Sequence, residues 1–174
     1  MMQYTMGIID APRVALQALR HFQGKEETWL AESCKVLFRD YALEHIQKAG
    51  REAVERHRAQ GDVLAIVTGA TPYIANPIAA ELGIENVVCT RLEVDADGRF
   101  TGRVIEPLCY GAGKIVLANV LGEKLGVKVE DATFYSDSIT DLPLLEAVKT
   151  PIVVNPDRRL RKIAAKRGWP VEAW

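Results

Sequence analysis

Hydrophobic residues recur every three or four positions through the first sixty residues, a spacing typical of amphipathic helices. The first such stretch begins at Asp10 and ends at Gly24. The second covers residues 28–60, and we expect Gly50 to interrupt it because glycine weakens a helix interior. This part of the chain is therefore predicted to be helical.

The pattern changes at residue 62, where short runs of β-branched residues begin to alternate with helical stretches. The expected strands cover residues 63–67, 87–89, 133–135 and 152–154, with a hairpin over 91–106 that turns at Asp97 and Gly98. The expected helices cover residues 76–83, with Asn76 as the cap and Pro77 in the first turn, then 113–125, 142–148 and a basic helix capped by residues 155–157. This alternation predicts an α/β fold with a Rossmann-like, mostly parallel sheet and one β-hairpin.

Composition narrows the class of protein. A chain of 174 residues is about one domain, and 22 basic against 23 acidic side chains create no overall field toward nucleic acid or an anionic membrane. No apolar run approaches the roughly 18 residues of a membrane helix. Three cysteines without CxxC spacing argue against disulfides and a zinc site. We therefore expect a cytoplasmic protein with no nucleic-acid or membrane partner.

The basic stretch over residues 158–167 needs its own interpretation. Six basic side chains without an acid would suit a nucleic-acid patch. We favour a solvated helix face, with Leu160 and Ile163 turned toward the core.

Two polar clusters stand where ligands bind in open α/β sheets, beyond the carboxyl ends of strands. Thr68 and Gly69 follow the strand over 63–67, where a hydroxyl and backbone N–H groups could hold a phosphate oxygen or simply cap the next helix. Lys114, in CYGAGK, could neutralise a phosphoryl group or could be a solvated surface lysine. Because Leu108 and Ile115 break GxxxxGK[ST], this is not a P-loop.

A third cluster places two carboxylates, Asp137 and Asp141, directly after the strand over 133–135. Carboxylates at a strand end suit Mg²⁺, which keeps most of its waters and pairs with substrate phosphate. The alternative is that both aspartates cap the helix that starts near Leu142.

Taken in order, the three clusters resemble the haloacid dehalogenase superfamily, in its phosphoserine-phosphatase-like branch, subfamily IB. GDVLAIVTGAT, GKIVLANVL and YSDSITDLPLLEAV carry the resemblance. It implies a partial helical cap over residues 1–50 and an α/β core over 51–174. It further implies a Mg²⁺-dependent phosphomonoester hydrolase acting on a small phosphorylated metabolite.

The resemblance also assigns roles to residues. Thr68, with Gly69 and Thr140, would bind the phosphorylated substrate, and Lys114 would stabilise the charge of the phosphoryl group. Asp137 would hold Mg²⁺, and Asp141 would support either that site or Lys114. Thr140 stands where phosphoserine phosphatases often have asparagine, so phosphoserine itself is not indicated.

One part of the family pattern is missing. Its first motif, DxDx[TV], carries the aspartate that attacks phosphorus and the aspartate that acts as general acid and base. Asp10 is the only candidate, and Pro12 stands where the second aspartate should be. We therefore expect a truncated chain that is inactive by itself. The alternative is a catalytically dead regulatory protein that binds phosphate and Mg²⁺.

The missing motif belongs to the first core strand, between the strands that carry Thr68 and Asp137. Its absence would leave unpaired backbone groups, each costing about 1–3 kcal/mol when buried. The flanking strands could close up, residues 3–9 could fill the position, or another chain could supply a strand. The oligomeric state, including a homo-oligomer, stays open.

Overall fold

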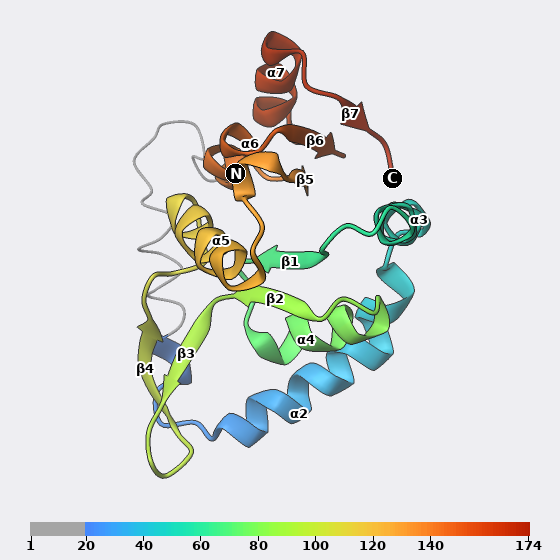
Figure 1. Cartoon of the computed structure of the whole chain (residues 1–174). Coiled ribbons are helices and arrows are strands. Elements are labelled where there is room, and N and C mark those ends of the chain that lie inside the picture. Colours follow the sequence, from blue (N-terminus) through green and yellow to red (C-terminus); the bar gives the residue numbers. More distant parts are fainter. Residues whose placement is uncertain (1–19) are drawn as a thin grey trace.

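The computed structural model describes residues 20–174, in which helices separate the strands from β1 onward, except that β2, β3 and β4 follow one another directly (Figure 1). The α-helices are α2 (Glu27–Leu37), α3 (Lys48–Ala59), α4 (Pro72–Glu81), α5 (Ala112–Leu125), α6 (Leu142–Ala147) and α7 (Arg158–Arg167). The strands are β1 (Ala65–Thr68), β2 (Asn86–Cys89), β3 (Arg91–Val94), β4 (Phe100–Ile105), β5 (Thr133–Ser136), β6 (Thr150–Val154) and β7 (Val171–Glu172). Short helical turns are η1 (Arg20–Phe22), η2 (Phe38–Ala42), η3 (Leu43–His45), η4 (Val129–Asp131) and η5 (Ile139–Asp141). The expected helix start at Asp10 and the segment over residues 3–9 lie outside the described residues.

The strands form three separate groups. β1 and β2 pair in parallel, β5, β6 and β7 form a second parallel sheet in that order, and β3 and β4 form the antiparallel hairpin. The α/β class with mostly parallel strands is therefore confirmed. β7, with two residues, was not predicted because so short a strand leaves no period in the sequence.

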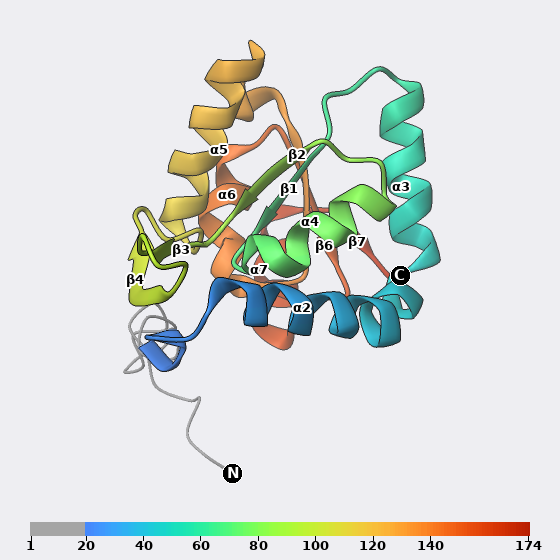
Figure 2. The ribbon, with the colours of Figure 1, turned by 90° about the horizontal axis from the view of Figure 1, so that it is seen from below.

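The first hydrophobic core joins the hairpin to the helices below β2. α4 packs on β1 and β2, and α2 lies along α4 (Figure 2). Phe100 of β4 is 2% exposed, and the rings of Phe22 and Tyr73 meet it edge-on, with centroids 6.0 and 5.9 Å away. Leu30 and Leu92 complete this cluster from α2 and β3. Phe100 thus connects the hairpin to η1 and to α4.

The second core lies among α6, β6 and α7. Leu145, Val153 and Leu160 are fully buried there. The Asp157 carboxylate accepts hydrogen bonds from the first amides of α7, which confirms its predicted capping role. Leu160 faces the core as expected, and the basic side chain of Arg167 pairs with Glu146 on α6.

Two helix predictions were wrong. α4 starts at Pro72 with Thr71 as its N-cap, so Pro77 lies inside the helix. A proline at the first helical position explains this start, because its fixed φ angle suits that position and its missing N–H costs nothing there.

Gly50 lies within α3 and does not interrupt it. A Cβ atom at this position would lie 3.0 Å from the ring of Trp174. Glycine therefore serves close packing here, and the helical stretch breaks instead at Ile46, which is extended.

Within the described part of the chain, β1 and β5 each have one edge that no strand pairs with. They belong to different sheets, so these strands have not closed up. Within residues 20–174, no strand pairs with the edge of β1 opposite β2 or with the edge of β5 opposite β6. The cap and core boundaries of the sequence analysis stay predictions. In the same part of the chain, no helix has the length and apolar character needed to cross a membrane.

Candidate functional site

Lys114 lies at the centre of a buried polar cluster at the carboxyl ends of β1 and β5. Its side chain is 8% exposed, and its Nζ lies 2.7 Å from Oδ1 of Asp141. The same Nζ donates to the carbonyl of Val67, the residue before Thr68, at 3.4 Å. The interpretation of Lys114 as a solvated surface lysine is therefore wrong. This ion pair joins the end of β1, the first turn of α5 and the loop after β5.

A glycine places Lys114 in this position. A Cβ atom at Gly113 would lie 2.0 Å from the carbonyl oxygen of Leu108, so no other residue fits. The loop before α5 can therefore fold back tightly on itself, and α5 begins one residue earlier, at Ala112. Gly113, the second glycine of CYGAGK, therefore allows this close backbone approach.

Asp141 is buried and its carboxylate is fully engaged. Oδ2 accepts a hydrogen bond from Ser136 Oγ at 2.8 Å, and Oδ1 accepts from Thr140 Oγ1 at 3.5 Å beside Lys114. Asp141 occupies the N-cap position of α6, but its side chain makes no capping hydrogen bond. The sequence analysis left open whether Asp141 supports the Mg²⁺ site or Lys114, and in the structure Asp141 contacts Lys114.

Ser136 is a site residue that the sequence analysis missed. It is 7% exposed, its hydroxyl donates to Asp141, and its oxygen accepts from the amide of Ser138 at 3.1 Å. Ser138 in turn accepts from the amide of Thr140 and shares a hydrogen bond with the Thr140 hydroxyl. These hydrogen bonds hold the loop after β5 in one conformation, and we call it the locked loop. A serine at the last position of a strand, just before Asp137, was the only available signal.

Asp137 lies in this locked loop but its carboxylate is exposed. None of the hydrogen bonds and ion pairs in the described part of the chain uses that carboxylate, and Ser138, not Asp137, caps η5. No group of three acidic, histidine or cysteine ligands occurs among these residues. A single free carboxylate still fits Mg²⁺, because Mg²⁺ in proteins is commonly held by one or two carboxylates together with substrate phosphate and water.

Thr68 ends β1 beside the Lys114 pair. Its Oγ1 accepts a hydrogen bond from the amide of Ala70 at 3.1 Å. Thr71, not Thr68, is the N-cap residue of α4, so the capping alternative for Thr68 is wrong. Gly69 is exposed next to it. The structure thus brings Thr68, Lys114, Thr140 and Asp141 into one cluster, with Asp137 at its exposed edge.

Cys109 packs behind this cluster. It is fully buried, its Sγ donates to the carbonyl of Val88 at 3.7 Å, and burial raises the pKa of its thiol from 9.0 to about 11. The folded protein therefore carries about a hundredfold less Cys109 thiolate at pH 8 than the unfolded chain.

We expect iodoacetamide to alkylate Cys109 at least a hundredfold more slowly in the folded protein at pH 8 than in guanidinium chloride, because only the thiolate reacts and the side chain is inaccessible. Peptide mass mapping over time measures the rate for each cysteine. Equal rates in the folded and unfolded protein would show that Cys109 is not buried.

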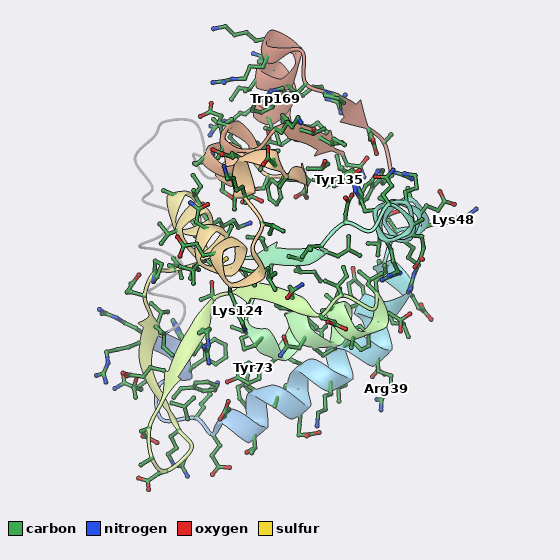
Figure 3. All side chains as sticks on the ribbon, viewed as in Figure 1. Arg39, Lys48, Tyr73, Lys124, Tyr135 and Trp169 are labelled. Carbon is green, nitrogen blue, oxygen red and sulfur yellow. The ribbon has the colours of Figure 1, made fainter. Side chains whose placement is uncertain are left out.

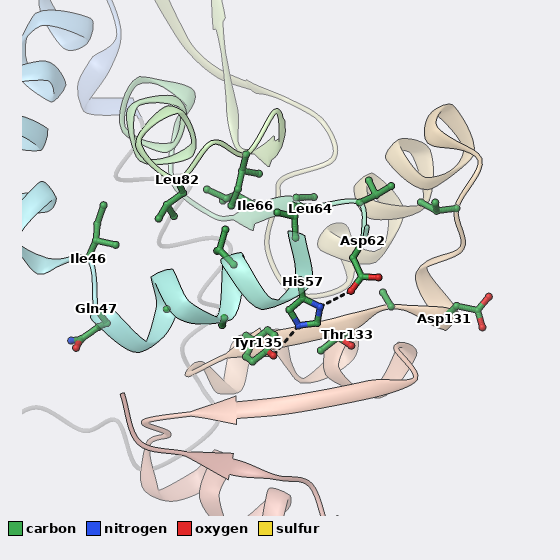
Figure 4. Close-up of a pocket in the computed structure, with 18 of the residues that line it drawn as sticks. Ile46, Gln47, His57, Asp62, Leu64, Ile66, Leu82, Asp131, Thr133 and Tyr135 are labelled. Carbon is green, nitrogen blue, oxygen red and sulfur yellow. Dashed lines mark hydrogen bonds and ion pairs between the residues drawn. The ribbon is translucent and has the colours of Figure 1, made fainter. Parts of the chain in front are cut away.

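A cavity of about 840 Å³ lies toward the amino ends of the strands, lined by β1, β5, α3 and Trp174 (Figure 4). On its wall, His57 Nδ1 hydrogen-bonds Asp62 Oδ2 at 2.6 Å, and His57 Nε2 hydrogen-bonds the Tyr135 hydroxyl at 3.0 Å. Figure 3 shows Tyr135 on the side of β5 that faces α3. This cavity is distinct from the Lys114 cluster.

Comparison with known proteins identifies the family and the relatives that this chain resembles. The family model of haloacid dehalogenase-like hydrolases matches residues 2–146. A histidinol-phosphatase of Neisseria meningitidis is 37% identical over 150 residues, which are 84% of this chain and 67% of that protein. Phosphoserine phosphatase SerB1 of Mycobacterium tuberculosis is 33% identical over 89% of this chain, which spans 50% of that relative's length. A solved structure from Bordetella pertussis, of unknown function, superposes with a TM-score of 0.86 at 34% identity, over 97% of this chain and 76% of that one.

Proposed function

Because the chain belongs to the haloacid dehalogenase-like hydrolase family, we propose that its Lys114 cluster is the phosphate-binding part of a phosphomonoester hydrolase. The observation that carries the proposal is the buried Lys114–Asp141 pair between the ends of β1 and β5. The names of the relatives, a histidinol-phosphatase and a phosphoserine phosphatase, support a small phosphorylated metabolite as substrate.

The hydrogen bonds of the cluster leave donors available for a phosphoryl group. Lys114 has three N–H donors, of which one points to Asp141 and one to the carbonyl of Val67. Thr68 accepts from Ala70 through its oxygen, which leaves its hydroxyl proton to donate. A phosphate oxygen at the end of β1 would therefore receive one hydrogen bond from Thr68 and one from Lys114.

Mg²⁺ is part of the proposal as well. Asp137 would hold the ion together with phosphate oxygens and water, since its carboxylate is exposed and unused in the described part of the chain. A bound Mg²⁺ would neutralise the charge on the phosphoryl group. Asp141 would keep Lys114 oriented, because both of its oxygens are already engaged by neighbouring side chains.

The aspartate that attacks phosphorus in this family has no counterpart among the carboxylates of the cluster. Asp141 is committed to Lys114 and Ser136, and Asp137 is assigned to the metal. We therefore propose that these 174 residues bind phosphate but hydrolyse phosphate esters negligibly. The alternative, a regulatory protein that binds phosphate and Mg²⁺ without catalysis, is favoured by the same missing motif.

Calorimetric titration with inorganic phosphate, with and without Mg²⁺, tests the proposal beside an assay with p-nitrophenyl phosphate. We expect saturable, Mg²⁺-dependent phosphate binding and no turnover above background. Asp137→Asn should weaken the Mg²⁺-dependent binding at least tenfold, whereas Asp131→Asn, an exposed carboxylate near the amino end of β5, should leave it unchanged.

The possible results separate the two functions. Absence of saturable phosphate binding would contradict both of them. Saturable binding without turnover is expected for both functions, and an affinity in the micromolar range, tight enough for binding to be the function itself, would favour the regulatory protein. Robust turnover that Asp137→Ala abolishes would show that these residues do contain a nucleophile and would contradict the proposal of negligible hydrolysis.

A further inference from the structure

One side of α7 is strongly basic and open to solvent. The helix contains six basic side chains and no acid, and all six are exposed. Its buried side chains, Leu160 and Ala164, face the second core, and Arg167 reaches across to Glu146 of α6. Figure 3 shows nitrogen-tipped side chains of α7 extending away from the rest of the molecule. The helix therefore presents charge, and not apolar surface, to the outside.

Four of these cations form a continuous surface, which we call the basic face. It consists of Arg158, Arg161, Lys162 and Lys166. Because an α-helix has about 3.6 residues per turn, these four positions fall on one side, opposite the two buried residues. Within residues 20–174, none of the four side chains forms an ion pair or a side-chain hydrogen bond. The basic face is therefore not neutralised by the described part of its own chain.

This arrangement is unfavourable for the helix itself. Like charges four positions apart repel each other, and Lys162 has such a neighbour on either side, Arg158 and Lys166. Arg158 also stands in the first turn, where the helix dipole favours acids. The helices α2 and α3 differ, because they contain the ion pairs Lys35–Glu32, Lys48–Glu52 and Arg58–Glu55. A role outside the chain accounts for charges that are unfavourable within it.

The surroundings of the basic face select the kind of partner. The rest of the chain is acidic, because 23 acidic and 22 basic side chains occur overall and six of the basic ones lie in α7. A long polyanion such as nucleic acid would therefore be repelled beyond the helix. An anionic membrane is disfavoured as well, because Ala165 is the only uncharged exposed residue of α7 and offers no apolar anchor. A short acidic segment of a protein fits both conditions.

The spacing of the cations suits a second helix. Arg158, Lys162 and Lys166 follow one another at four-residue intervals, which is about 6 Å along the helix axis. Glutamates at the same intervals on a neighbouring helix have the same spacing, so each could face one cation. The arginines can offer a carboxylate two parallel N–H donors. α7 has ten residues and is about 15 Å long, which is enough for three such contacts.

We propose that the basic face of α7 binds an acidic helix of a partner protein, with glutamates at every fourth position. This surface goes beyond the proposed function, because none of its residues belongs to the Lys114 cluster and the binding requires neither phosphate nor Mg²⁺.

A synthetic peptide tests the proposal on the 174-residue chain. The peptide is alanine-based and carries glutamates at four-residue intervals. We expect saturable one-to-one binding by calorimetry in about 50 mM salt, and at least tenfold weaker binding in about 500 mM salt, because salt screens exposed charges. A peptide of the same composition with its glutamates at consecutive positions should bind at least tenfold more weakly, since they no longer lie on one side of the helix.

Two double variants test the location. Arg158→Gln with Lys162→Gln should weaken peptide binding at least tenfold, because it removes two neighbouring cations of the basic face. Lys48→Gln with Lys128→Gln is the matched control, since these side chains are 91% and 72% exposed on other surfaces, and binding should stay unchanged. The α7 variant should melt at no lower temperature than the original chain, because it relieves repulsion between like charges. Phosphate titration of the same samples reports separately on the proposed function.

Several results would overturn the proposal. Absence of saturable peptide binding, or unchanged binding in the α7 variant, would show that the basic face is not the site. Equal binding of the two peptides would show a general attraction between charges without helix pairing. Tighter binding of a single-stranded oligonucleotide than of the peptide would identify nucleic acid as the partner. Adsorption to phosphatidylserine vesicles that the α7 variant loses would identify a membrane.

Discussion

Replacing Lys114 with methionine is expected to lower the free energy of unfolding by about 3–5 kcal/mol. Lys114 and Asp141 are each 8% exposed in their side chains, and their charged atoms lie 2.7 Å apart. Removing the ammonium leaves the Asp141 carboxylate buried without its counter-ion, and that uncompensated charge accounts for most of the cost. Urea denaturation at pH 7 measures the change, and phosphate binding should be lost in the same variant.

A double variant and a surface control test whether the lost stability comes from the buried, unpaired charge. Lys114→Met combined with Asp141→Asn should recover a large part of the lost stability, because the second change removes the unpaired charge. Lys128→Met breaks an exposed pair with Glu130, at 72% and 71% side-chain exposure, and should cost no more than about 1 kcal/mol. A loss of less than about 1 kcal/mol for Lys114→Met would mean that the pair is not buried as described.

Phe100→Ala is expected to cost about 3–5 kcal/mol, through lost burial and the cavity left behind. The ring contacts Phe22 and Tyr73, so its removal loosens the connection of the hairpin to both η1 and α4. Phe100→Leu keeps most of the apolar contact and should cost about 1–2 kcal/mol. Thermal and urea unfolding monitored by circular dichroism provide the test, and equal losses for both variants would contradict a role for the ring.

The sequence was most informative where short-range chemistry decides the structure. Asp157 caps α7 because its carboxylate lies next to the first free amides of that helix. The hairpin turns at Asp97 and Gly98, with Gly98 at a φ of 73°. In contrast, Gly50 is explained by Trp174, a residue that is distant in the sequence, so no local rule could separate a packing glycine from a helix breaker.

The candidate site, too, was predicted only in part from the sequence. The order of strand ends and helix starts, together with the family resemblance that it carries, led us to expect Thr68, Lys114 and Asp141 in one place. The sequence did not reveal that Ser136 would bond Asp141 or that Asp137 would stay exposed. Those facts depend on how the loop after β5 closes on itself, and serines and aspartates there have several equally good local hydrogen-bonding choices.

Trp174 has a consequence for the order in which the chain folds. Its ring lies against Gly50 of α3 and 5.6 Å from the ring of Tyr135, and its backbone exchanges hydrogen bonds with the Asn155 side chain. Contacts between residues so far apart form slowly, because a long loop must close first. During synthesis on the ribosome, α3 would therefore emerge long before the residue that packs against it, and its docking would be a late event.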